Sequence, residues 1–243
     1  MKRGVWIGAA ALVVFLLVLI AEFPATWAAG LLPRAVSCQQ LSGSIWNGTC
    51  SGLVAQGAPF GDLSWTLRPA RLLAGRLNLD VDWMQATNFA RGDLEFGRGG
   101  ALTASDFHAT FPLDRRMIPQ LPPGIHGSAQ ADLAALHFDG KRVTAVQGQL
   151  DVHGLAQSDG TPLGDYRLSF PGGGGDEPAG HLSDLGGPLS VDGTLRLTRE
   201  PGFVLDAHVA ARPGAPPDLA QQIQYLGSPD AQGRRPFSVS ATF

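Results

Sequence analysis

Cysteine is scarce in this chain, with two residues among 243. Two cysteines cannot build the framework of a disulfide-rich fold, nor a zinc site made of cysteine alone. Charge is also modest, because 21 acidic and 18 basic residues leave a formal net charge of −3. A protein that binds nucleic acid over its whole surface is expected to be strongly basic, so this charge excludes that class.

Signatures of catalysis are missing as well. The sequence contains no G-x-S-x-G, H-E-x-x-H or G-x-x-x-x-G-K-[ST] motif. The six histidines are never three or four residues apart, and His137 with Asp139 lacks the third ligand that a metal site needs. Asp80 and Asp82 share the polar face of a predicted strand, where two solvated carboxylates need no catalytic role. We therefore predict no catalytic residue, no metal and no cofactor.

Long helices are excluded over most of the chain. Glycine contributes 32 residues and proline 18, and in a helix interior glycine costs roughly 1 kcal/mol and proline roughly 3 kcal/mol. Interruptions this frequent leave short strands joined by many turns. The exception is an uncharged apolar run from Gly4 to Ala21.

This apolar run predicts a membrane anchor. At 1.5 Å per residue it is just long enough to cross a bilayer core of about 30 Å. Lys2 and Arg3 precede it, and the positive-inside rule then keeps the N-terminus in the cytoplasm. We predict a cytoplasmic tail at 1–4, a single transmembrane helix at 5–21, and a periplasmic location for the remainder of the chain, on a bacterial inner membrane.

A cleaved signal peptide is the alternative interpretation. Thr26-Trp27-Ala28 resembles a cleavage site only loosely, and the apolar run exceeds the usual length of about 7 to 15 residues. The remainder is exported in either case. Removing Lys2 and Arg3 from the 18 basic residues leaves 16 against 21 acidic ones, so the exported part carries a charge of −5. An acidic exported domain is a poor candidate for binding nucleic acid.

Export also determines the expected state of Cys38 and Cys50. In an oxidising compartment a disulfide is the default for two cysteines 12 positions apart. In the chain-entropy model, closing a loop of this size stabilises the fold by about 3 kcal/mol. Two unpaired thiols remain the alternative. A redox-active pair is disfavoured because the spacing is unlike C-x-x-C.

Period-two alternation dominates the sequence after Pro33. In the clearest case, from Gly75 to Trp83, leucine, valine and tryptophan alternate with polar residues. The same G-x-L-x-apolar opening returns at Gly92, Gly148 and Gly193, at unequal intervals that exclude a fixed-period solenoid or propeller. Strands with one apolar and one polar face suit an antiparallel sheet. We predict a mainly β fold, elongated and antiparallel, forming a curved sheet or a sandwich.

Further elements complete this order. Other strand candidates carry aromatic or β-branched residues between turns, at 61–67, 106–111, 127–138, 143–147, 164–170, 203–211 and 237–243. A short C-terminal helix is expected from Pro217 to Leu226. Three prolines within 117–124 predict a stiff linker, which would separate a first lobe at 22–116 from a second lobe at 125–243.

Four motifs, in a fixed order, resemble one protein family. Phe23-Pro24-Ala25 follows the apolar run, and Gly43-Ser44-Ile45-Trp46-Asn47-Gly48 is similar to a G-T-V-W-x-G signature. A W-x-x-x-P…L-L-x-G segment and a closing L-G-x-x-D-x-x-G pattern follow. Together they resemble protein N of the bacterial type II secretion system. The residues that carry the resemblance beyond the span are Gly43, Trp46, Gly48, Trp65, Pro69, Gly75, Leu226, Gly227, Asp230 and Gly233.

The chain departs from this pattern at two points. Ser44 stands where threonine is common, and the pair Cys38 and Cys50 is not expected of every member. The resemblance implies an inner-membrane accessory component whose periplasmic β-rich domain assists the export of folded proteins. It implies partners among the other inner-membrane and periplasmic components of that machinery, and no catalytic residue.

A second function remains open. A curved sheet that is tethered at one end and apolar inside is also similar to the lipid-bridging periplasmic proteins of the AsmA type, so lipid is a possible ligand. An apolar groove open to solvent would favour this alternative. A closed interior filled with side chains would count against it.

Overall fold

The computed structural model describes residues 23–28, 36–55, 57–115, 121–175 and 177–242. The predicted cytoplasmic tail and transmembrane helix lie outside these ranges. Within them, no helix is both long enough and apolar enough to cross a membrane.

The chain folds as two compact units, unit 1 (Met1–Ala86) and unit 2 (Thr87–Phe243). The boundary between them differs from the predicted linker at 117–124. The predicted lobes at 22–116 and 125–243 stay a prediction, because much of that linker lies outside the described residues.

Unit 1 contains a four-stranded antiparallel sheet in which each strand pairs with the next along the chain. A short helix precedes the sheet, and a 3-10 helix joins its last two strands. The elements are α2 (Ala25–Ala28), β1 (Val36–Gly43), β2 (Asn47–Ala55), β3 (Ala58–Leu67), η2 (Pro69–Ala74) and β4 (Leu77–Gln85).

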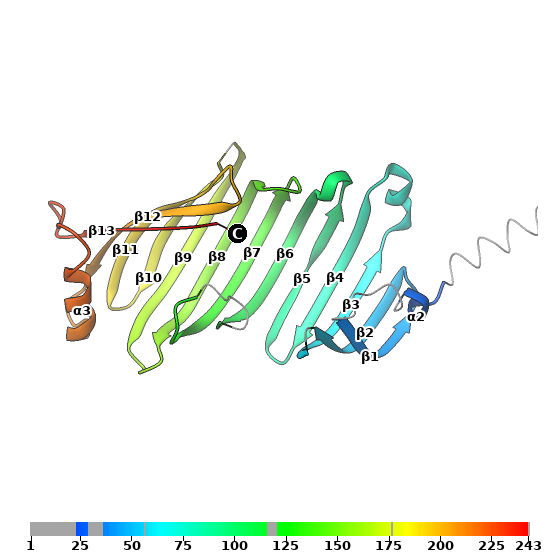
Figure 1. The fold of residues 1–243 in the computed structure, drawn as a ribbon, viewed down its shortest axis with the longest axis horizontal. Coiled ribbons are helices and arrows are strands. Elements are labelled where there is room, and N and C mark those ends of the chain that lie inside the picture. The colour runs from blue at the N-terminus through cyan, green and yellow to red at the C-terminus, as the bar shows by residue number, and fades with distance from the viewer. Residues whose placement is uncertain (1–22, 29–35, 56, 116–120, 176, 243) are drawn as a thin grey trace, which may run out of the picture. The chain divides into compact units, whose positions relative to one another are not determined.

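Unit 2 is a longer antiparallel meander, again with strands paired in chain order (Figure 1). Its elements are β5 (Asn88–Phe96), η3 (Arg98–Gly100), β6 (Leu102–Leu113), β7 (Ile125–Phe138), β8 (Val143–Gln157), β9 (Pro162–Gly174), β10 (Ala179–Gly186), β11 (Leu189–Leu197), β12 (Gly202–Ala211), α3 (Pro217–Gln224) and β13 (Arg235–Thr242). In Figure 1, α3 lies at the β11 to β13 end of this unit.

The mainly β, antiparallel prediction is confirmed, and so is the short C-terminal helix. The sandwich alternative is wrong for the described strands, because in each unit they form a single open sheet with no second sheet stacked on it. Alternation in one strand specifies an apolar face but not what covers that face, so the sequence supports both architectures equally.

The strand break expected at Gly148 is also wrong. Residues 143–147 and 148–152 belong to one strand, β8. Gly148 has φ of 136°, and a Cβ atom there would lie 2.2 Å from the Asp132 carbonyl oxygen. The register with β7 shifts beside it, so this glycine marks a bulge within a strand rather than a strand start.

Full burial is limited in both units, as a single sheet layer requires. The main buried cluster of unit 2 joins Leu189 on β11, Val209 on β12 and Leu219 on α3. The short helix thus packs its apolar side onto the end of the sheet.

Candidate functional site

The turn between β1 and β2 is built from the second family motif. Gly43 has φ of 85°, a conformation that favours glycine. Ser44 Oγ accepts hydrogen bonds from the backbone N–H groups of Trp46 at 3.2 Å and Asn47 at 3.1 Å. Serine therefore provides the hydroxyl acceptor within this turn.

The first motif lies against this turn. The backbone N–H of Ile45 donates to the Phe23 carbonyl oxygen at 3.0 Å, and Pro24 forms an isolated β-bridge with Ser44. Ala25, which follows in α2, is only 1% exposed. Two motifs that are separate in the sequence therefore meet in unit 1.

Gly48 and Trp65 of the second and third motifs are direct cross-strand partners. A Cβ atom at Gly48 would lie 2.3 Å from the Trp65 ring, so the glycine makes room for the indole. Trp65 Nε1 donates to the Ile45 carbonyl oxygen at 3.1 Å, which satisfies its polar group. The spacing of these motifs thus follows from packing.

Pro69 and Gly75 delimit η2. Gly75 has φ of 71°, and its N–H donates to the Leu72 carbonyl oxygen at 2.9 Å. Immediately before this helix, Arg68 makes two hydrogen bonds to the Asp80 carboxylate, at 3.0 and 3.1 Å. Asp80 therefore has a structural partner, which agrees with the interpretation of Asp80 as a solvated carboxylate on the polar face of its strand.

The closing motif forms a turn in unit 2, after α3. Gly227 and Gly233 have φ of 72° and 78°. Asp230 Oδ1 accepts the backbone N–H groups of Gln232 at 2.9 Å and Arg234 at 2.8 Å. Desolvation raises the pKa of Asp230, but these hydrogen bonds outweigh it, so its pKa is lowered. The structure gives all these motif residues local conformational roles, and their status as a family signature stays a prediction.

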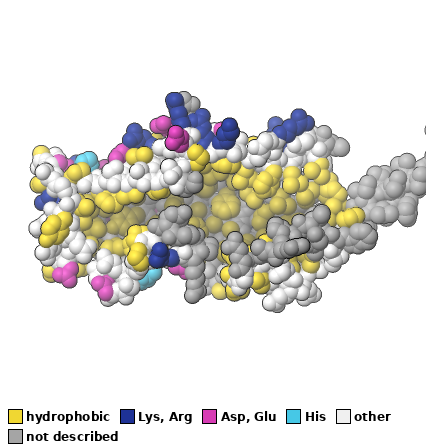
Figure 2. Space-filling view, in the orientation of Figure 1, with side chains coloured by type: hydrophobic (Ala, Val, Ile, Leu, Met, Phe, Trp, Pro, Cys, Tyr) yellow, Lys and Arg dark blue, Asp and Glu magenta, His cyan; other side chains and the backbone are white. Residues whose placement is uncertain are grey.

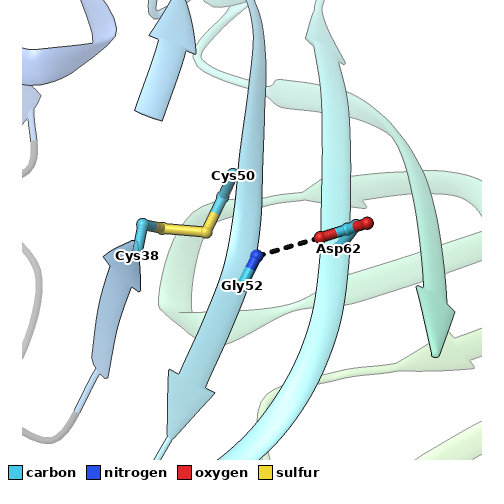
Figure 3. Close-up of a disulfide and its surroundings, with 4 residues drawn as sticks. All are labelled: Cys38, Cys50, Gly52 and Asp62. Atoms are coloured by element: carbon cyan, nitrogen blue, oxygen red, sulfur yellow. Dashed lines mark hydrogen bonds between the residues drawn. A yellow bond between two sulfur atoms is a disulfide. The ribbon is translucent and has the colours of Figure 1, made fainter. Parts of the chain in front are cut away.

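The predicted disulfide is confirmed, since Cys38 on β1 is bonded to Cys50 on β2 (Figure 3). The alternative of two unpaired thiols is wrong. Cys50 is 1% exposed, and the two Cα atoms lie 5.6 Å apart. Next to it, Gly52 has φ of 64° and donates its N–H to Asp62 Oδ1 at 2.9 Å, where the β2–β3 register shifts.

Unit 1 has an apolar cavity of about 360 Å³ on one face of its sheet. The disulfide and the Trp65 ring both line it. The other lining residues are aliphatic and come from α2 and all four strands: Ala25, Val36, Leu41, Leu53, Leu63, Leu67, Leu79 and Val81.

Unit 2 has a larger apolar groove, of about 490 Å³, which we call the inner groove. It crosses the strands, because residues of β6, of β8 to β13 and of α3 all line it. Its lining is Leu113, Leu121, Val152, Leu155, Leu163, Tyr166, Leu182, Leu189, Val191, Ala207, Val209, Ile223, Leu226 and Phe237. Figure 2 shows hydrophobic side chains in a hollow on this face of unit 2, with charged side chains along its rims.

Among the described residues that line the inner groove, Tyr166 alone has a side-chain polar group, and this hydroxyl has a hydrogen-bond partner. Its hydroxyl donates to the Leu163 carbonyl oxygen at 2.6 Å. Burial, together with the nearby Asp184 carboxylate, raises the pKa of Tyr166 to about 12. The phenol therefore stays neutral at physiological pH, and the groove carries no charge of its own.

Asp184 on β10 is a structural residue that the sequence did not reveal. Its carboxylate accepts Arg212 Nη2 at 2.5 Å and the backbone N–H groups of Gly186 at 3.2 Å and Val191 at 3.1 Å. Desolvation raises its pKa, but these donors outweigh it and the pKa is lowered. A lone aspartate in a weakly patterned segment offers no signal of this role, because Arg212 is distant in sequence.

The outer face of unit 2 carries cross-strand pairs of opposite charge. Arg167 on β9 binds Asp151 on β8 through two contacts of 2.7 Å, and this hydrogen bonding lowers the pKa of Asp151. His108 Nδ1 lies 2.7 Å from Asp132 Oδ1. Across the described ranges, no group of three or more metal-ligating side chains comes together.

The pair His137 and Asp139 is separated by its contacts. His137 Nδ1 lies 3.1 Å from the Thr103 hydroxyl, whereas Asp139 Oδ1 accepts the backbone N–H groups of Lys141 and Arg142 in a turn. These hydrogen bonds lower the pKa of Asp139. Each residue thus has a local partner and a structural explanation.

The last strand, β13, has one unpaired edge. It pairs with β12 over its whole length without a register shift, and no described strand pairs with its other side. Phe237 and Val239 on it are 38% and 37% exposed. We call this the β13 edge; it offers backbone donors and acceptors beside apolar side chains.

Comparison with known proteins follows the resemblance seen in the motifs. The family model described as "Type II secretion system (T2SS), protein N" matches residues 34–238. The chain is similar to the type II secretion system protein N of Vibrio cholerae serotype O1 (strain ATCC 39315 / El Tor Inaba N16961), with 25% identity over 98% of each chain. It is also similar to the protein of the same name from Aeromonas hydrophila, with 26% identity over 97% of each chain. No solved structure matches significantly. With a family model covering most of its length, the chain belongs to the type II secretion system protein N family.

Proposed function

We propose that this chain is a non-enzymatic accessory component of the type II secretion machinery, anchored in the inner membrane with its β-rich units in the periplasm. Family membership makes it a component of that system, and the disulfide agrees with a location in the cell envelope. Asp80, His137 and Asp139, three of the residues weighed for chemistry, have structural partners, which supports a role in binding rather than catalysis.

The observation that best supports a binding role is the β13 edge. An exposed, regular strand edge is a template for adding a strand from another chain, and such pairing supplies main-chain hydrogen bonds. We propose that another component of the machinery adds a strand there. The expected partner surface is an extended segment with alternating apolar residues, which would continue the face of Phe237 and Val239.

Pro236 indicates which backbone N–H groups of β13 point outward. Proline has no N–H, so in an edge strand it occupies positions whose donor would face away from the sheet. Positions two and four residues further on, Ser238 and Ser240, share that direction because side-chain and donor directions alternate along a strand. The N–H of Val239 then belongs to the ladder with β12.

A matched pair of proline variants tests this proposal. Ser240→Pro removes one outward donor and should leave the β12–β13 ladder intact, whereas Val239→Pro breaks that ladder. We expect Ser240→Pro to reduce secretion of an exoenzyme at least fivefold while the chain accumulates with its disulfide formed. Val239→Pro should also lower the amount of folded chain. Normal secretion by Ser240→Pro would contradict docking at this edge.

The accessory role itself is tested by deleting the gene. In a strain with no second copy, secretion of a type II substrate should fall, and the wild-type chain should restore it. Undiminished secretion would reject the role, whatever the edge variants show.

A further inference from the structure

The inner groove of unit 2 is an apolar pocket that opens to solvent. Every described residue of its lining is aliphatic or aromatic, and the one hydroxyl among them, that of Tyr166, already donates to Leu163. A concave lining of this kind is typical of a ligand site. Its volume, about 490 Å³, lies within the range of about 300 to 1,000 Å³ found for small-molecule pockets.

The lining restricts the polarity of the occupant. A sugar, a nucleotide or an extended peptide brings polar groups that lose their hydrogen bonds to water on entry, at a cost unless the site replaces them. The described lining side chains provide no free donor, and the Tyr166 hydroxyl oxygen is the one acceptor among them. The occupant is therefore a hydrocarbon group.

The course of the groove favours an elongated occupant. Residues of β6, of β8 to β13 and of α3 line it, so it runs across successive strands. A hydrocarbon chain is thin and flexible enough to follow such a path.

We infer that the inner groove binds one acyl chain of a membrane phospholipid. Phospholipid is the acyl-chain source that we commit to, because the chain functions in an envelope bounded by bilayers. Among the described residues no charged side chain lines the groove, so the headgroup would stay in solvent at the rim, where Figure 2 shows charged side chains. The groove lies on the inner face of the sheet, whereas the β13 edge offers backbone donors and acceptors. Phe237 contributes to both, so the edge is tested at Ser240, which does not line the groove.

Photo-crosslinking in cells tests the inference with the full chain in its own membranes. The photoreactive residue benzoylphenylalanine replaces Phe237, an aromatic side chain in the groove, and in a second variant Ile223 on α3. The control replaces Thr194, which is exposed on the outer face of β11. After irradiation, intact-mass spectrometry identifies the adducts.

We expect phospholipid adducts at both groove positions, at least tenfold more abundant than at Thr194. Lipid adducts of equal abundance at all three positions would show only contact with bulk lipid, and this would overturn the inference. Adducts with protein alone would mean that a macromolecule covers the groove, and this would also overturn it, as would the absence of any adduct. Two groove positions are used so that poor accumulation of one variant does not end the test.

A filling variant provides the second measurement. Val191→Trp places an indole in the groove and should lower the lipid adduct at Phe237 at least fivefold, whereas Thr194→Trp on the outer face of the same strand should not change it. The oxidised disulfide of unit 1 and an unchanged circular dichroism spectrum establish that the chain is folded. Because Ser240→Pro is expected to retain the lipid adduct, failure of lipid binding and failure of partner docking are distinguishable.

Discussion

Contacts of single residues account for the spacing between several of the motif residues. Gly48 has no side chain because the Trp65 ring occupies that space, and Gly43 has a positive φ because the turn after it closes on Asn47. Both are packing or backbone requirements. Sequence reasoning could identify these residues as a pattern, but not their contacts, because the two strands of Gly48 and Trp65 are paired only in the folded chain.

Replacing Gly48 should therefore be costly. Gly48→Val would place a Cβ atom 2.3 Å from the Trp65 ring and displace the indole from the Ile45 carbonyl. Overpacking of this kind typically destabilises by about 1 to 3 kcal/mol. We expect a lower urea midpoint and a shifted tryptophan emission. Gly175→Ala, where the added methyl group meets open space, is the matched control and should change neither quantity.

Asp184 makes a second residue-scale prediction. Asp184→Asn removes the charge that Arg212 binds, and loss of a hydrogen bond to a charged group costs about 1.5 to 3 kcal/mol. We expect the free energy of unfolding at pH 7 to fall by about this amount. Asp82→Asn, at an exposed site on β4, is the control and should stay within about 0.5 kcal/mol of the wild type.

The pH dependence of this difference follows from the direction of the pKa shift. The folded pKa of Asp184 is lowered from the ordinary value of 3.8, so its carboxylate stabilises the fold above that value, and the contribution is lost as pH falls through the folded pKa. The difference in the free energy of unfolding between the wild type and Asp184→Asn should therefore be constant from pH 7 to about 5 and shrink below pH 4. A gap that stays constant down to pH 3 would contradict this account.

At the scale of elements, the sequence predicted strands well where alternation was strong and missed them where it was weak. The leucine, valine and tryptophan residues that alternate along β4 were enough to predict it as a strand. β10 was missed because its sequence, AGHLSDLG, is rich in residues with low strand propensity. Contacts with the neighbouring strands stabilise β10 instead. Gly180 of β10 leaves room for the Phe170 ring of β9, and pairing with β9 and β11 holds the β10 backbone in place.

The β1–β2 hairpin makes the prediction at this scale. Cys38→Ser with Cys50→Ser opens the covalent loop that ties the two strands of unit 1, and the chain-entropy model gives a loss of about 3 kcal/mol. We expect a lower urea midpoint for the tryptophans of unit 1, equal to that of the reduced wild type. If reduction of the wild type leaves the midpoint unchanged, the disulfide does not stabilise unit 1.

At the scale of the whole molecule, alternation predicted an antiparallel β protein but could not decide between a sheet and a sandwich. In each unit, apolar side chains on one face of the sheet line a pocket: the cavity of unit 1 and the inner groove of unit 2. No second sheet of described strands covers that face. The sequence alone therefore could not predict the groove. It depends on how many strands of one sheet contribute to the same surface, which is a property of long-range pairing.

The N-terminal run makes the last prediction, on the topology of the whole chain. Since 18 uncharged residues exceed a usual signal-peptide core, we expect the apolar run to remain attached as an anchor. Intact-mass spectrometry of the chain isolated from inner membranes should give the full-length mass. Proteolysis of spheroplasts should digest both units, because we expect them to lie on the periplasmic side of the membrane. A mature chain that begins near residue 29 and leaves the membrane fraction would mean cleavage, and the docking at the β13 edge would then have to retain the protein at the machinery without a tether.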